Sequence, residues 1–193
     1  VEVKDFVTGE WALIPLAGPA NRQGRIAADV IAGRDSRFRG TQGTSVIGLF
    51  GATVAMTGAN EKTLKRLGQT DYEKVYLFPN SHAGYYPGAT TVVLKVIFRK
   101  SDGRLLGAQA LGSAGVDKRV DALALAIQMG ATVYDLEEAE LCYAPPFGSA
   151  KDPVNFAGMA PANVLRGDMP LTHWDSLDGA LLLDVRNPPE VAA

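Results

Sequence analysis

The stretch that decides the fold is residues 91–112, TVVLKVIFRKSDGRLLGAQALG. Its first part, Thr91 to Arg99, is rich in β-branched residues and has apolar residues at alternate positions, which is typical of a strand with one buried face. Its second part, Arg104 to Gly112, follows a short loop that contains Gly103, as in a β-hairpin. We therefore predict two paired antiparallel strands. The apolar positions on the buried face of the first strand are Val92, Leu94, Val96 and Phe98.

An amphipathic helix is predicted directly after this hairpin. Val120, Leu123, Ala124 and Ile127 recur at helical spacing, and Gly130 stands where a helix commonly ends in a left-handed cap. The helix has one apolar face to bury against the hairpin. An antiparallel sheet covered by helices on one face and exposed to water on the other satisfies both elements. The sequence thus predicts an α+β fold with flanking helices, and not a nucleotide-binding α/β sheet.

The composition is that of an ordinary globular protein. The chain has 193 residues, of which 47% are hydrophobic and 21% are charged, so we expect one main domain with additional material. A net charge of −2 provides no basic surface for nucleic acid. No apolar run approaches the roughly 20 residues that span a membrane. The single cysteine, Cys142, excludes an intrachain disulfide and favours a cytoplasmic location.

Further elements are predicted on both sides of the hairpin. Before it, Glu2 to Leu16 is irregular, and a helix from Gly18-Pro19 to about Ala32 precedes a polar, Gly-punctuated boundary. The other predicted elements are strands at 45–50 and 72–78, a helix at 60–67, a capping box at 132–135, a helix opened by Asp152-Pro153, a linker at 160–170 and a strand at 180–185.

Two loops rich in Gly and Pro carry candidate functional tyrosines. Tyr85 lies in the first loop, residues 79–88, and Tyr143 lies in the second, residues 142–153. Loops held by a rigid scaffold often carry sites. A phenol can donate a hydrogen bond to a thiolate or an oxyanion. Packing in a core or an interface is the alternative role for both residues, and the local sequence leaves the two open.

The other reactive residues favour structural roles. His82 and His173 are the only histidines, Cys142 has no cation near it in the sequence, and Lys118-Arg119 is more typical of a solvated or salt-bridged face than of a phosphate site. We find no dinucleotide fingerprint, no P-loop and no cluster of metal ligands. The bare helix start at Leu16-Ala17-Gly18 suits an anion or a carbonyl oxygen, although an ordinary buried helix start is favoured.

Four segments together resemble the C-terminal part of the flavin-dependent pyridine nucleotide-disulfide oxidoreductases, in the branch of coenzyme A disulfide and persulfide reductases. A fifth segment, HWDSLDGALLLDVRNPPEV at 173–191, resembles the opening of a rhodanese domain. The four segments are IPLAGPANRQGRIAADVIAG at 14–33, HAGYYPGA at 82–89, GVDKRVDALALAI at 115–127 and YAPPFGSAKDPVNFAG at 143–158.

The resemblance implies a domain organisation. Residues 1–39 would be the C-terminal tail of an FAD-binding domain, 40–157 a dimerisation domain, 158–170 a linker, and 171–193 the truncated start of a rhodanese-like domain. Because the chain starts at Val1 and has no Met there, and because a motif runs into its last residues, we expect a fragment of a longer polypeptide. We expect the fragment alone to be inactive and to bind no cofactor or metal.

The resemblance also implies roles for particular residues. Leu16, Ala17 and Gly18 would place backbone N–H groups near a flavin carbonyl, as cofactor-binding residues. Tyr85 and Tyr143 would be catalytic residues that reach across a homodimer to a coenzyme A disulfide or persulfide substrate in the partner's active site. The parent enzyme would use NAD(P)H and FAD, with its redox cysteine upstream of Val1, so Cys142 does not match that nucleophile.

Two alternatives to this function remain. In the first, the parent is an NADH oxidase or peroxidase of the same superfamily, with oxygen or peroxide as the acceptor. In the second, the chain is a dimerisation module whose tyrosines are buried at the interface and contact no substrate. The paired tyrosines and the rhodanese-like opening argue against the oxidase.

Overall fold

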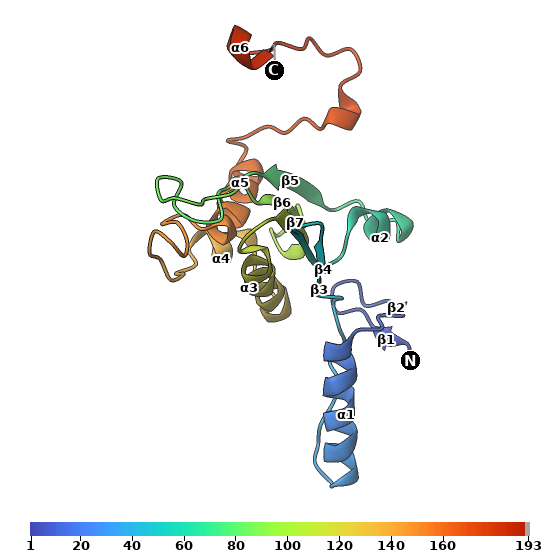
Figure 1. The fold of residues 1–193 in the computed structure, drawn as a ribbon. Coiled ribbons are helices and arrows are strands. Elements are labelled where there is room, and N and C mark those ends of the chain that lie inside the picture. The colour runs from blue at the N-terminus through green and yellow to red at the C-terminus, as the bar shows by residue number, and fades with distance from the viewer. Residues whose placement is uncertain (192–193) are drawn as a thin grey trace.

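A computed structural model describes residues 1–191 of the chain (Figure 1). A five-stranded sheet forms its centre, a short N-terminal hairpin and a helix precede the sheet, and helices follow it. The elements in chain order are β1 (Val3–Lys4), β2 (Trp11–Ala12), α1 (Ala17–Ile31), β3 (Ser45–Leu49), β4 (Ala52–Gly58), α2 (Glu61–Arg66), β5 (Glu73–Leu77), β6 (Val93–Phe98), β7 (Leu105–Gly112), α3 (Val116–Met129), α4 (Val133–Glu137), α5 (Pro153–Arg166), a 3-10 turn (Trp174–Ser176) and α6 (Pro188–Val191).

The central sheet is wholly antiparallel, with the strand order β3-β4-β7-β6-β5. The hairpin predicted from residues 91–112 is its middle, because β6 and β7 pair with Leu94 opposite Ala110 and Val96 opposite Ala108. Large residues on β6 thus face small residues on β7, which leaves room for a helix above β7. The α+β fold predicted from the sequence is confirmed.

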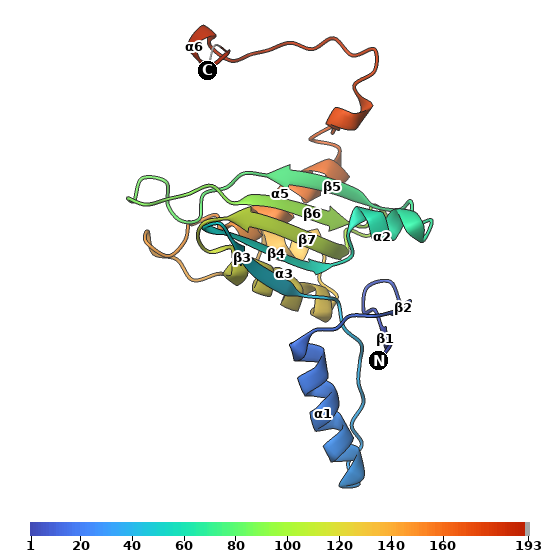
Figure 2. The ribbon, with the colours of Figure 1, turned by 45° about the vertical axis from the view of Figure 1, so that its right-hand side comes forward.

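The core lies between this sheet and the helices on one of its faces (Figure 2). Helix α3 packs on β4 and β7, and α5 packs on β5 and β6. The alternate residues predicted for the buried face of the first hairpin strand, Val92, Leu94, Val96 and Phe98, are fully buried there together with Val120 and Leu123 of α3. The opposite face stays open near β3 and β4, where Ile47 and Val54, which pair directly across the two strands, are exposed.

Local chemistry determines where several of these helices begin and end. Thr132 and Asp135 form the predicted capping box of α4, and Asp152 caps α5 with Pro153 at its first position. Helix α3 ends at Gly130 in the left-handed conformation, as predicted. The structure adds a strand that the sequence analysis did not predict, β4, which pairs with β3 through a tight turn at Phe50-Gly51.

Two predictions made for the C-terminal third are wrong. The linker expected from residue 158 or 160 to residue 170 is largely helical, because α5 continues through Pro161 to Arg166 and buries Pro161 and Ala162. Pro161 is tolerated although a helix-interior proline gives up one backbone hydrogen bond. The strand expected at 180–185 is irregular and exposed, because no described strand pairs with it. Residues 192–193 of the expected rhodanese-like segment lie outside the described residues.

Helix α1 projects away from the sheet (Figures 1 and 2). It begins at Ala17, one residue before the predicted Gly18, and it buries none of its residues. Every side of this helix is therefore at least partly exposed in this chain. None of the helices in residues 1–191 has the length and apolar character needed to cross a membrane.

Candidate functional site

Tyr85 lies on a long loop that connects β5 to β6. Backbone hydrogen bonds close the base of this loop, where the N–H of Val92 donates to the carbonyl of Pro79 at 2.8 Å and the N–H of Ser81 donates to the carbonyl of Thr90 at 2.7 Å. The Tyr85 side chain projects from the outer part of the loop and is 77% exposed. A closed base with an exposed tip is suited to present a side chain to a second molecule.

Tyr143 lies on the loop that connects α4 to α5. Prolines at 145, 146 and 153 exclude regular structure, and a turn forms where the N–H groups of Phe147 and Gly148 both donate to the carbonyl of Ala144. The loop ends at Asp152, which accepts a hydrogen bond from the Val154 N–H at the start of α5. Tyr143 is 47% exposed.

The two loops meet, and their tyrosines form a pair. The N–H of Ala83 donates to the carbonyl of Gly148 at 2.8 Å, which joins the loops through their backbones. The hydroxyl oxygens of Tyr85 and Tyr143 lie 2.8 Å apart. One hydroxyl must donate to the other, so one O–H of the pair is left to donate outward. The pair can therefore offer a hydrogen bond to an anionic atom that approaches it.

The hydroxyl pair also affects the ionisation of Tyr85. Its hydrogen bond with Tyr143, and to a lesser extent the burial of the hydroxyl, raises the pKa of Tyr85 above its ordinary value. The upward direction favours the protonated phenol, which is the form that donates a hydrogen bond.

A buried arginine, which the sequence analysis assigned to a solvated or salt-bridged face, lies beneath the two loops. The side chain of Arg119 on α3 is 2% exposed, and its Nη2 donates to Asp152 Oδ2 at 2.8 Å. The salt bridge that was one of the two predicted roles is confirmed, although the pair is buried and does not lie on an exposed face. The sequence spacing indicates this burial. Arg119 stands three residues after Val116 and four before Leu123, so it shares the apolar face of α3.

The other residues singled out from the sequence are not hydrogen-bonded to the tyrosine pair in the described structure. His82 Nδ1 lies 3.1 Å from the carbonyl oxygen of Ala83, and His173 Nε2 lies 2.9 Å from Glu73 Oε1. Cys142 is an exposed free thiol that directly precedes Tyr143. Within residues 1–191, no group of His, Cys, Asp and Glu side chains is arranged to hold a metal ion.

Leu16, Ala17 and Gly18 lie apart from the tyrosines, at the start of α1. Leu16 is the N-cap residue, and its side chain makes no capping hydrogen bond, so the first N–H groups of the helix remain available. A cavity of about 410 Å³ lies beside Leu16 and Ala17, and it is also lined by Val1, Val3 and Gln23. The bare helix end thus offers the backbone N–H groups of Ala17 and Gly18 as hydrogen-bond donors.

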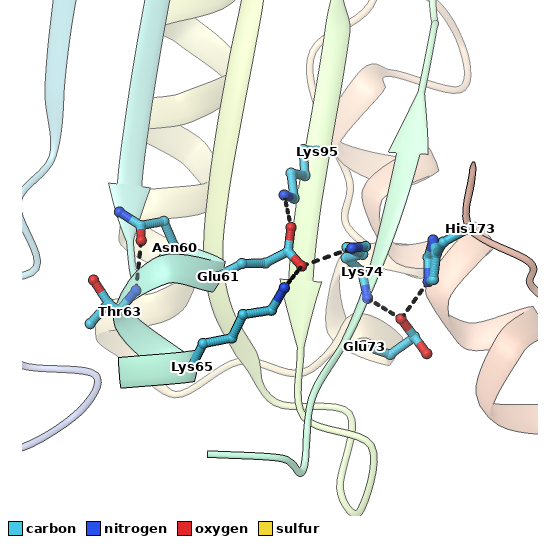
Figure 3. Close-up of polar contacts among 8 residues, drawn as sticks. All are labelled: Asn60, Glu61, Thr63, Lys65, Glu73, Lys74, Lys95 and His173. Atoms are coloured by element: carbon cyan, nitrogen blue, oxygen red, sulfur yellow. Dashed lines mark hydrogen bonds and ion pairs between the residues drawn. The ribbon is translucent and has the colours of Figure 1, made fainter. Parts of the chain in front are cut away.

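A second polar cluster, which the sequence analysis missed, joins α2 to the sheet (Figure 3). Glu61 accepts hydrogen bonds from Lys74 at 2.8 Å and from Lys95. Burial raises the pKa of Glu61, but the hydrogen bonds from Lys74 and Lys95 outweigh burial and lower that pKa to about 2. Residues 61, 74 and 95 are far apart in the sequence, so no local pattern reveals the cluster.

The C-terminal segment contacts the same edge of the sheet. His173 contacts Glu73 at the start of β5 (Figure 3), and the ring of Trp174 lies 4.5 Å, centroid to centroid, from the ring of Tyr76. A cavity of about 550 Å³ lies between this segment, α2 and β5. These contacts attach residues 173–176 to the sheet, whereas residues 180–191 are exposed.

Comparison with known proteins gives consistent matches. The family model for the pyridine nucleotide-disulphide oxidoreductase dimerisation domain matches residues 45–153. The coenzyme A disulfide reductase of Staphylococcus epidermidis is 40% identical over 148 residues, which are 76% of this chain and 33% of that protein. The corresponding enzyme of Staphylococcus aureus strain JH9 is 39% identical over the same length. The chain thus spans about one third of the length of the curated relatives that it matches.

Solved structures agree with the sequence comparison. The reduced Bacillus anthracis CoADR-RHD structure is 54% identical with a TM-score of 0.96, over 100% of this chain and 35% of that one. The NAD-dependent persulfide reductase of A. fulgidus is 38% identical with a TM-score of 0.83, over 86% of this chain and 31% of that one. The water-forming NADH oxidase of Lactobacillus brevis, at 24% identity and a TM-score of 0.82 over 87% of this chain and 37% of that one, shares the fold.

Proposed function

Since this chain belongs to the pyridine nucleotide-disulphide oxidoreductase family through its dimerisation domain, we propose that it serves within an NAD(P)H-dependent disulfide or persulfide reductase. In that enzyme it would form the homodimer and complete the partner subunit's active site. The observation that carries this proposal is the exposed hydroxyl pair of Tyr85 and Tyr143, joined at 2.8 Å. Relatives named coenzyme A disulfide reductase and persulfide reductase support the substrate class.

The tyrosine pair would act on the charge that develops when a sulfur–sulfur bond breaks. Cleavage leaves one sulfur as a thiolate, and the free O–H of the pair donates a hydrogen bond to that sulfur. A donor placed where charge develops lowers the barrier, and removal of one such donor typically costs about 100-fold or more in rate. The raised pKa of Tyr85 is consistent with this role, because only the protonated phenol can donate.

The cofactors of the proposed enzyme are FAD and NAD(P)H, which would supply the electrons for cleavage of the sulfur–sulfur bond. In this chain, Leu16 to Gly18 would hold the flavin through the backbone N–H groups at the start of α1. The exposed tyrosine loops would lie against the partner subunit's site, where they limit the access of water to the new thiolate. The rhodanese-like role of residues 171–193 remains a proposal from their sequence.

The main alternative is an NADH oxidase or peroxidase of the same superfamily. The Lactobacillus brevis oxidase supports it only at the level of the fold, because its identity to this chain is 24%. The identities to a persulfide reductase, at 38%, and to coenzyme A disulfide reductases, at 40%, favour the sulfur substrate.

The test is Tyr143→Phe and Tyr85→Phe in the complete reductase that carries this segment. We expect each variant to lose about 100-fold in disulfide or persulfide turnover while its dimer, measured by sedimentation, stays intact. Tyr86→Phe is the control, since Tyr86 lies beside Tyr85 but packs edge-on against His82. Unchanged turnover with a weaker dimer would instead assign the tyrosines to a dimerisation module. A loss of oxygen reduction equal to the loss of sulfur turnover would favour the oxidase.

A further inference from the structure

We propose that Arg119 is the positioning residue of the tyrosine pair: its guanidinium clamps together the two loops that carry Tyr85 and Tyr143. The catalytic importance of this clamp rests on the proposed function. The clamp itself can be tested without a catalytic assay.

The guanidinium of Arg119 contacts three separate segments at once. Toward the second loop, Nη2 and Nε donate to the two carboxylate oxygens of Asp152 at 2.8 and 3.2 Å. Toward the first loop, Nη2 donates to the carbonyl of Ser81 at 2.7 Å. Nη1 donates to the carbonyl of Gly115 at 3.1 Å, at the start of its own helix. A planar fork with several fixed donors is needed for this geometry, and the ammonium of lysine does not provide it.

These contacts lie close to the points where the loops meet. Ser81 is near the closed base of the first loop, two residues before Ala83, whose N–H bonds to Gly148 on the second loop. Gly148 packs directly over the ion pair, since a Cβ built on it would lie 3.4 Å from Asp152 Oδ2 and 3.8 Å from Arg119 Nη2. The same Cβ would lie 3.6 Å from the carbonyl oxygen of Cys142, next to Tyr143. The clamp is thus continuous with both tyrosine loops.

The chain makes room for the clamp at Gly115. This residue has φ +67°, and a Cβ on it would lie 2.2 Å from Arg119 Nη1. Any other residue at 115 would therefore combine a strained backbone with displacement of the guanidinium.

Stability alone does not account for this buried pair. The side chains of Arg119 and Asp152 are only 2% and 4% exposed. Desolvation of two charges offsets most of their attraction, and apolar or neutral replacements of a buried ion pair are often equally stable. What such replacements lose is the fixed geometry of the fork. We therefore infer that Arg119 serves to fix the position of the two loops relative to each other.

The experiment uses this chain and the alkaline titration of Tyr85 as a reporter of the hydroxyl pair. The double variant Arg119→Met/Asp152→Asn removes both charges, keeps an N-cap side chain on α5 and preserves apolar burial. The control is Arg166→Met/Glu137→Gln, which removes an ion pair between α5 and α4 that does not touch the loops. The signal of Tyr85 is the absorbance difference between each protein and its own Tyr85→Phe version, recorded where circular dichroism shows the folded state.

We expect the upward shift in the pKa of Tyr85 to disappear in the Arg119→Met/Asp152→Asn variant, as it does in Tyr143→Phe, and to persist in the control. Arg119→Lys keeps the charge and should lose most of the shift, so it serves as the second variant if the first does not fold. A shift retained in either folded Arg119 variant would overturn the clamp. An unshifted Tyr85 in the wild-type chain, or one that Tyr143→Phe does not change, would overturn the hydroxyl pair and with it the proposed function.

Discussion

Gly158 of α5 lies so close to Glu137 of α4 that a Cβ built on Gly158 would be 2.2 Å from the Glu137 backbone nitrogen. The same Cβ would lie 2.5 Å from the carbonyl oxygen of Val133. Both neighbours are backbone atoms, which cannot rotate away as a flexible side chain can. The short helix α4 can therefore pack this closely against α5 only because residue 158 has no side chain.

Gly158→Ala should lower the free energy of unfolding by about 1–3 kcal/mol, the usual cost of overpacking a tight interface. Gly24→Ala is the control, because Gly24 is also helical but has nothing within 4 Å of its Cβ position. At Gly24 we expect no loss, or a gain of up to about 1 kcal/mol, from the better helix propensity of alanine. Urea unfolding of the two variants measures the difference, and equal stabilities would contradict the packing.

Glu61→Gln should destabilise the chain in a pH-dependent way. The native pKa of Glu61 is lowered from the ordinary 4.5 to about 2, so its network with Lys74 and Lys95 stabilises the fold above pH 4.5. This contribution is lost as the pH falls from 4.5 through 2. We expect a loss of about 1–2 kcal/mol at pH 7, in the range of hydrogen bonds to charged groups in partly exposed sites.

The measurement for Glu61 is thermal or urea unfolding of the wild type and the variant across that pH range. The difference in the free energy of unfolding between the wild type and the variant should be largest near neutral pH and should disappear toward pH 2. Glu137→Gln is a suitable comparison, because Glu137 pairs with Arg166 on an exposed face and should change stability less. A difference that does not depend on pH would show that Glu61 acts through packing rather than through its charge.

Tyr76→Leu should loosen the attachment of the C-terminal segment. It removes the ring against which Trp174 packs, a type of contact worth about 0.5–1.5 kcal/mol. In a Trp11→Phe background, Trp174 is the remaining tryptophan, so its fluorescence reports on this contact alone. We expect stronger quenching of Trp174 by acrylamide in Tyr76→Leu.

The global unfolding midpoint should change little in Tyr76→Leu, because residues 173–176 are attached to the sheet and are not part of its core. Tyr134→Leu provides the control, since the Tyr134 ring instead packs against Arg166. If the quenching of Trp174 were the same in all three proteins, Trp174 would not depend on Tyr76 for its place.

The parts of the fold that the sequence predicts are those governed by neighbours in the chain. Alternation in Thr91 to Arg99, the capping box at Thr132, and the left-handed end at Gly130 are all local signals, and all three are confirmed. The failures have non-local causes. Residues 180–185 are apolar and extended enough to suggest a strand, but a strand forms only where another edge pairs with it. Pro161 is a helix breaker by propensity, yet burial against the core keeps α5 intact.

In the candidate site, too, local features could be predicted from the sequence and contacts between distant residues could not. Tyr85 and Tyr143 were identified from their loops, but their separation by 58 positions hides the contact between their hydroxyls from any local reading of the sequence. The salt bridge of Arg119 agrees with the sequence prediction, but its burial is not evident when Arg119 is considered with its neighbour Lys118 as a pair of charges. Its position in the apolar stripe of α3 was the better guide. Its partners, Ser81 and Asp152, come from two other segments and are found only in three dimensions.

The exposed thiol of Cys142 makes this chain convenient for spectroscopy. Because the sequence contains one cysteine, a maleimide fluorophore or a nitroxide spin label attaches at a single place without any engineered substitution. That place is adjacent to Tyr143, on the loop that carries half of the hydroxyl pair. Trp174 and Trp11 are natural donors for energy transfer to such a label. The mobility of the loop, and its approach to a second subunit, is thereby open to direct measurement in solution.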